Sequence, residues 1–83
     1  MVITRGGAKT PEQLLGEAIS KLRNARGFSQ EELGFQAGIH RTYVSQIERG
    51  IKSPTLVVIL KLAQALSCPA SRLVMEVERQ LKQ

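Results

Sequence analysis

Four polar residues lie at a spacing that would bring them to one side of a short helix. They are Arg41, Thr42, Ser45 and Gln46, and the second two follow the first two by one helical turn. The planar donor fork of Arg41 fits the two acceptors on a guanine edge, and Gln46 can pair with adenine through two hydrogen bonds. Thr42 offers a hydroxyl and a methyl group, which suit thymine or a phosphate. These side chains could therefore read base edges in a DNA groove, although Arg41 could instead bind phosphate alone.

Five further residues flank this set and can contact a phosphate backbone: Gln30, His40, Tyr43, Arg49 and Lys52. Gln30 would begin a helix, where backbone amides and the helix dipole favour a phosphate. Arg49 and Lys52 follow the reading set as candidate phosphate clamps, although Arg49 could pair with a surface acid. Tyr43 could pack on a sugar, donate to phosphate or be a half-buried packing residue. His40 is expected to be a helix cap or a phosphate neighbour.

The stretch from Ser29 to Arg49 predicts two short helices joined by a tight turn, which would hold these side chains. Ser29 is a good N-cap, and Glu32 lies three residues later, as in a capping box. Gly38 supplies the positive φ that a sharp turn needs. Gly34 has no Cβ, which would let the second helix cross close to the first. This combination predicts a helix-turn-helix, whose second helix enters a DNA major groove.

Helical periodicity and capping residues predict three more helices, which makes the chain all-α with five helices. Thr10 caps the first of them, and Pro54 forbids helix at the residue before it. Two adjacent glycines and the absence of periodicity mark residues 1–9 as a flexible lead to a single domain of residues 10–83. The three additional helices are expected at Pro11 to about Arg26, about Leu56 to Leu66, and about Ala70 to Leu81.

A set of short motifs follows in order along most of the chain, from about Leu15 to Leu73. They are Leu22-Arg23, Gly27-Phe28-Ser29-Gln30-Glu31-Glu32-Leu33, Gly38-Ile39, Ile47-Glu48-Arg49-Gly50, Ser53-Pro54-Thr55-Leu56 and Leu62-Ala63-Gln64-Ala65-Leu66. This set resembles the XRE-type, lambda-repressor-like helix-turn-helix family, which implies a compact five-helix DNA-binding domain. The run from Gly38 to Ser45 is also similar to the controller proteins of restriction–modification systems, which implies control of restriction–modification genes.

The resemblance also implies roles for three residues. In related repressors an arginine at the position of Arg23 pairs with the glutamate of the Glu-Arg-Gly motif, which is Glu48 in this chain. We therefore expect Arg23 and Glu48 to form a structural pair. A glutamine at the position of Gln30 contacts the DNA backbone in related repressors, which agrees with its expected place at the start of a helix.

The fourth expected helix carries more apolar residues than one buried face needs. Val57, Val58 and Leu60 remain outside its expected core face, and a small surface helix does not usually expose so many apolar groups. In the fifth helix Leu73 and Val77 repeat at helical spacing, which either covers the first helix or adds to a twofold interface. We expect these five residues to form the interface of a homodimer. The expected core face of the fourth helix is Leu56, Ile59, Leu62, Ala63 and Leu66.

The composition favours a polyanionic partner. The 83 residues include 12 Lys and Arg against 7 Asp and Glu, a formal net charge of +5. Cys68 is the only cysteine, so no intramolecular disulfide can form, as expected in the cytoplasm. One histidine and one cysteine make no metal site, and no apolar run is long enough to span a bilayer. We expect no cofactor and no small-molecule ligand.

These observations predict a sequence-specific DNA-binding transcription regulator that acts as a homodimer on a palindromic site. Two recognition helices about 34 Å apart would meet successive major grooves on one side of the double-stranded DNA. The alternative is a protein-interaction module built on a helix-turn-helix, such as an antitoxin or a coactivator adaptor, in which the surplus apolar residues hold a partner. An enzyme is not expected, because the sequence offers no nucleophile–base pair, metal cluster or phosphate loop.

Overall fold

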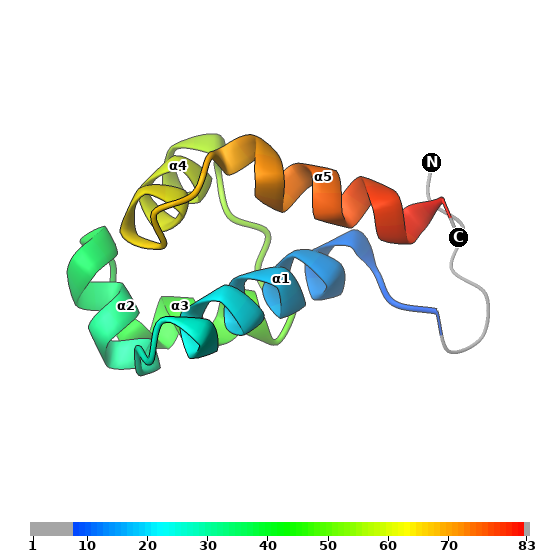
Figure 1. The fold of residues 1–83 in the computed structure, drawn as a ribbon. Helices are drawn as coiled ribbons and strands as arrows, with labels where there is room; N and C mark the ends of the chain where they lie inside the picture. Colours follow the sequence, from blue (N-terminus) through cyan, green and yellow to red (C-terminus); the bar gives the residue numbers. More distant parts are fainter. Residues whose placement is uncertain (1–7, 83) are drawn as a thin grey trace.

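The computed structural model describes residues 8–82, and these residues form five helices. They are α1 (Pro11–Ala25), α2 (Gln30–Ala37), α3 (Arg41–Glu48), α4 (Leu56–Ala65) and α5 (Ala70–Leu81). α1 packs against α3 and α5, α2 packs against α3 and α4, and α4 packs against α5, which closes the chain into one bundle (Figure 1). The all-α, five-helix prediction is confirmed. The expected lead lies outside the described residues except for Ala8 and Lys9.

Side-chain caps define where the helices begin. Thr10 forms a complete capping box: its hydroxyl accepts from the backbone N–H of Gln13, whose side chain accepts from the N–H of Thr10. The Ser29 hydroxyl accepts from the backbone N–H of Glu32 at 2.9 Å, as expected. The carboxylate of Glu32 turns to Gln36, whose Nε2 donates to it at 2.8 Å. The cap at α2 is therefore one-sided rather than reciprocal.

The turn between α2 and α3 depends on two glycines. Gly38 has a φ of 72°, in the left-handed region that favours glycine. The backbone N–H of Ile39 then donates to the carbonyl oxygen of Gly34 at 2.9 Å, which closes the turn. A Cβ on Gly34 would lie 2.7 Å from the carbonyl oxygen of Ile39 and 3.2 Å from the backbone nitrogen of Arg41. The prediction that Gly34 permits a close crossing is confirmed.

Apolar side chains from all five helices meet in one core. α1 also presses its backbone against the end of α3 at Gly16, where a Cβ would lie 2.4 Å from the carbonyl oxygen of Ile47 and 2.5 Å from that of Glu48. α3 is thus fixed against α1 as well as against α2. The core residues are Leu15, Ala18, Ile19, Leu33, Ala37, Val44, Ile47, Leu62, Ala63, Leu66 and Leu73.

Three assignments in the C-terminal helices are corrected. Leu56, expected in the core face of α4, is 69% exposed, whereas Val58, expected outside it, packs against the core. Thr55 caps α4, so Leu56 is its first residue and precedes the turn that meets the core. Leu73, expected in the dimer interface, is 1% exposed and belongs to the core. Because α5 packs against α1, Leu73 has no surface left for a second chain.

Candidate nucleic-acid interface

The outward side of α3 carries the four residues that were expected to read bases. On the opposite side Val44 and Ile47 are fully buried and fasten the helix to the core. The outward residues are Arg41 and Thr42, which are exposed, and Ser45 and Gln46, which are half-buried. The helix therefore presents two successive turns of hydrogen-bonding side chains from a rigid support.

The first turn of α3 is capped by His40, and its Arg41 forms a weak ion pair with Glu31 on α2. The Nδ1 atom of His40 accepts from the backbone N–H of Thr42 at 2.9 Å, so this side chain serves as the N-cap. Arg41 Nη1 lies 3.8 Å from Glu31 Oε1, and both side chains are largely exposed. Exposed pairs of this kind contribute little free energy. The guanidinium of Arg41 can therefore exchange Glu31 for a base edge at small cost.

The remaining residues expected to contact phosphate lie at the two ends of the helix pair. Gln30 is the first residue of α2, and its Nε2 donates to Oε1 of Glu48 at 3.0 Å. Arg49 and Lys52 follow α3 and are exposed. Tyr43 is half-buried and packs against the core, the arrangement of a packing residue. Gln30 and Tyr43 are half-buried and Arg49 and Lys52 are exposed, so a phosphate contact from each of them stays a prediction.

Arg23 and Glu48 meet in a bidentate ion pair that joins α1 to the end of α3. Arg23 Nε donates to Glu48 Oε2 at 2.7 Å, and Nη2 donates to Oε1 at 3.1 Å. The remaining Nη1 donates to the carbonyl oxygen of Phe28 at 2.8 Å. Only 13% of the Arg23 side chain and 6% of the Glu48 side chain are exposed. The pair is therefore shielded from water and satisfied by additional hydrogen bonds.

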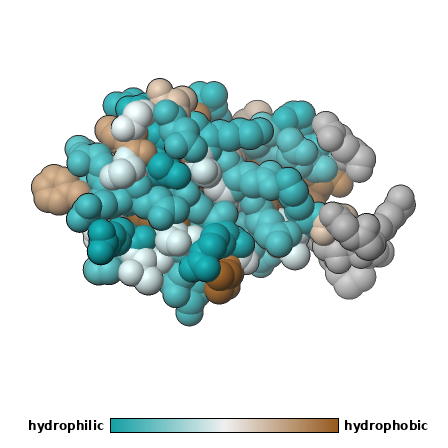
Figure 2. Space-filling model, turned by 90° about the horizontal axis from the view of Figure 1, so that it is seen from below, coloured by the Kyte–Doolittle hydropathy of each residue, from teal (hydrophilic) through white to brown (hydrophobic). Residues whose placement is uncertain are grey.

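The face on the side of α1, α2 and α3 is largely hydrophilic (Figure 2). In the sequence between Lys21 and Lys61 there are seven cations and three carboxylates; Arg23 and Glu48 neutralise each other, which leaves six and two, and one of the six, Lys61, lies on α4. A surface with surplus cations attracts phosphates at long range. The cations are Lys21, Arg23, Arg26, Arg41, Arg49, Lys52 and Lys61, and the carboxylates are Glu31, Glu32 and Glu48.

Several large apolar side chains on α4 and α5 are exposed. We call this set the α4–α5 surface; it consists of Leu56, Val57, Leu60, Val74 and Met75. Val57 and Leu60 are the two members that the sequence predicts for this surface; the other three are not predicted. Val58 and Val77, also expected there, are half-buried and pack partly against the core. The exposure of Phe35 on α2, which is 81%, was likewise not anticipated.

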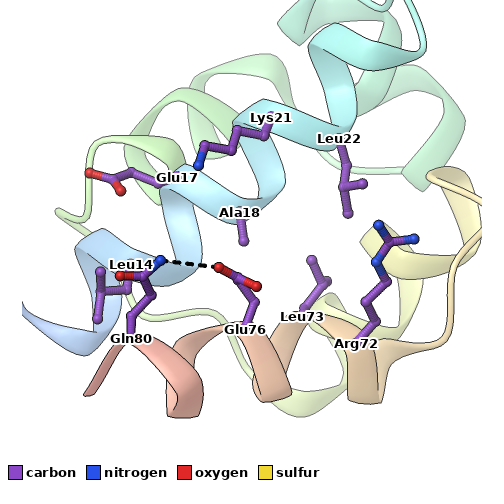
Figure 3. A pocket seen from close by; sticks show the side chains of 9 residues that line it. All are labelled: Leu14, Glu17, Ala18, Lys21, Leu22, Arg72, Leu73, Glu76 and Gln80. Carbon is purple, nitrogen blue, oxygen red and sulfur yellow. Dashed lines mark hydrogen bonds between the residues drawn. The ribbon is translucent and has the colours of Figure 1, made fainter. Parts of the chain in front are cut away.

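A hollow of about 250 Å³ lies between α1 and α5 (Figure 3). Leu73 forms part of its apolar floor, and its charged lining residues are Glu17, Lys21, Arg72 and Glu76. Hydrogen bonds from Arg79 and Gln80 lower the pKa of Glu76 below its ordinary value, so this carboxylate stays charged. With two cations and two carboxylates, the lining favours no charge class of ligand.

Within residues 8–82, no three His, Cys, Asp or Glu side chains gather closely enough to hold a metal ion. No single helix of this part has the length and apolar content to cross a bilayer. α4 and α5 have that length and apolar content only when they are counted together, and the two helices are bent by 108° relative to each other.

Comparison with known proteins places these features in context. A family model described as helix-turn-helix (HTH_3) matches residues 19–73. Control protein C.SmaI of Serratia marcescens is 36% identical over 62 residues, which cover 75% of this chain and 74% of that protein. The crystal structure of the restriction–modification controller protein C.AhdI from Aeromonas hydrophila superposes with a TM-score of 0.74. It is 44% identical and covers 75% of this chain and 94% of its own.

A structure that contains DNA is also similar. The master regulator for biofilm formation SinR, solved in complex with DNA, has a TM-score of 0.70 and is 30% identical. The match covers 72% of this chain and 97% of that chain.

Proposed function

Because this chain belongs to the helix-turn-helix (HTH_3) family and is a DNA-binding transcriptional regulator, we propose that it acts as a homodimer on a palindromic operator. We further propose that its targets are restriction–modification genes, as the names of C.SmaI and C.AhdI indicate for those relatives. The regulator works in the cytoplasm, on the chromosome or plasmid that carries those genes.

One observation carries the sequence-specific part of this proposal: the outward side of α3. Its buried residues fix the helix in the bundle, and its free side presents donors and acceptors of the kinds that base edges require. Base reading is assigned to Arg41, Thr42, Ser45 and Gln46. Phosphate contacts from Gln30, Arg49 and Lys52 would fix the register of the protein on the duplex.

The homodimer is supported by the α4–α5 surface. A single small domain makes too few contacts for tight and specific binding, and a twofold pair doubles them. Exposed apolar residues on α4 and α5, two helices that pack against each other, give a self-complementary interface a place to form. The twofold axis would present two copies of α3 to the same side of the duplex.

A mobility-shift titration tests the target genes. The duplex would come from upstream of a restriction or controller gene in the source genome, and a shuffled duplex of equal composition would be the control. At near-physiological salt the proposal expects binding to the upstream duplex at least about 10³-fold tighter than to the shuffled one. Equal affinity for the two duplexes would contradict control of those genes.

A further inference from the structure

We propose that Glu48 is a positioning residue for DNA binding, which orients the carboxamide of Gln30 toward a backbone phosphate. This inference rests on the proposed function, because it needs Gln30 to lie against DNA. It assigns Glu48 a role beyond its ion pair with Arg23: the carboxylate holds the donor that touches the ligand.

The geometry begins with the two hydrogens of the Gln30 side-chain nitrogen. One N–H is engaged by Glu48 Oε1, at a donor–acceptor distance of 3.0 Å. A primary carboxamide has a second N–H in the same plane, fixed in direction once the first is bound. Gln30 is only half-buried, so this second N–H can reach a ligand at the surface. Without the contact to Glu48, the same side chain would rotate among several rotamers and lose entropy on binding.

The acceptor is itself held in place. Arg23 binds both oxygens of Glu48, at 2.7 Å and 3.1 Å, so the carboxylate cannot turn away from Gln30. Arg23 is also anchored by the carbonyl oxygen of Phe28, in the segment that leads into α2. These contacts link Arg23 on α1 to Glu48 at the end of α3 and then to Gln30 at the start of α2. They therefore fix the side-chain carboxamide of Gln30 at the surface.

The charge balance of this network explains why the acceptor can be a carboxylate. A lone Glu48 would repel an approaching phosphate, but Arg23 neutralises it within a site from which water is largely excluded. The network therefore offers a fixed acceptor to Gln30 without adding a net negative charge beside the DNA.

Single methylphosphonate substitutions test this role, because each one removes the charge of one phosphate in the bound operator. The first step is to find the phosphate at which substitution weakens wild-type binding about fivefold more than it weakens binding by Gln30→Ala. This fivefold effect is what one lost hydrogen bond should give. The double variant Arg23→Met/Glu48→Leu is then tested at that phosphate. Apolar replacement of both partners of a buried pair usually preserves folding, and here it removes the acceptor for Gln30.

The double variant should be as insensitive at that phosphate as Gln30→Ala, although it still carries Gln30. Glu48→Gln keeps a side-chain oxygen that can accept from Gln30, and it should recover most of the fivefold effect. Lys52→Ala is the matched control: it removes a different phosphate contact and should leave the effect at the Gln30 phosphate unchanged.

Two results would overturn the inference while leaving operator binding intact. One is a double variant that keeps the full fivefold effect, which would mean that Gln30 needs no positioning. The other is a Gln30→Ala protein that responds to every methylphosphonate as the wild type does, which would mean that Gln30 touches no phosphate. Failure of the wild type to prefer any operator would refute the proposed function itself, and the inference with it.

Discussion

Arg41 stands at the first position of α3, where its guanidinium is exposed and, within residues 8–82, forms only a loose pair with Glu31. Its type and place were evident from the sequence, because a cap residue, a turn glycine and a polar helix start are local signals. The partner of Gln30 was not evident, because its hydrogen bond to Glu48 spans 18 positions of the chain. No local pattern specifies such a contact, which depends on how three helices pack.

Replacing Arg41 by alanine should weaken binding to the preferred operator by about 1–3 kcal/mol and relax the preference at one base position. The reason is the loss of a donor fork that fits one base pair only. Affinities for the four duplexes that differ at that position provide the measurement. Lys52→Ala is the control, since a phosphate contact should weaken all four alike and reduce the salt slope by about 1. An unchanged base preference in Arg41→Ala would show that Arg41 reads no base.

The pair of Arg23 and Glu48 should matter for folding as well. Arg23→Ala leaves a carboxylate that is 6% exposed without its cation, which should lower the free energy of unfolding by about 3–5 kcal/mol. Urea unfolding, monitored by circular dichroism, measures this loss of stability. The exposed pair of Arg79 and Glu76 supplies the comparison, and Arg79→Ala should leave the unfolding midpoint almost unchanged. Similar midpoints for the two variants would rule out a special role for the buried pair.

At the scale of helices, the helix-turn-helix was predictable and the orientation of α4 was not. Caps and glycines define α2, its turn and α3 through contacts within a few residues, so the sequence carried enough information. α4 begins with Leu56, Val57, Val58, Ile59 and Leu60, five apolar residues in succession. Such a run has no polar side to mark the outer face, so periodicity cannot choose between orientations. Packing against α2 and α5 decides it, and turns Val58 inward and Leu56 outward.

The contact between α1 and the end of α3 should be the least tolerant of added volume. Gly16→Ala places a Cβ against two backbone carbonyl oxygens, which cannot rotate away, and should cost about 3 kcal/mol of stability. Gly27→Ala is a useful comparison, because a Cβ there meets no atom within 4 Å. That variant should lose only about 1 kcal/mol, from the strain of its positive φ. Thermal unfolding of both variants checks the difference, and equal losses would contradict the close contact.

At the scale of the whole molecule, most of the exposed large apolar side chains among residues 8–82 lie on α4 and α5, with Phe35 and Ile51 as the exceptions. The side of α1, α2 and α3 is largely hydrophilic (Figure 2), and the α4–α5 surface belongs to the other two helices (Figure 1). The sequence predicted that such a surface exists, from the surplus of apolar residues in α4. It did not define all members correctly, because Leu73 is buried in the core of the bundle.

The α4–α5 surface should control the oligomeric state. Leu60→Glu places a charge in the proposed interface and should convert a dimer into a monomer of 9.1 kDa in sedimentation equilibrium at micromolar concentration. Phe35→Glu changes a side chain that is even more exposed but lies on α2, and it should remain a dimer. A Leu60→Glu protein that stays dimeric would move the interface elsewhere. A monomeric wild type would instead favour a partner protein on this surface.

Selection of binding sites from a random duplex library tests the central claim most directly. The purified wild-type protein would be used at near-physiological salt, and the bound duplexes would be sequenced after each round. A sequence-specific homodimer predicts recovery of a dyad-symmetric motif, with half-sites spaced so that two copies of α3 meet successive major grooves. Recovery of no motif, together with binding that disappears as salt is raised, would contradict the account. It would mean that the protein binds DNA only through non-specific phosphate contacts.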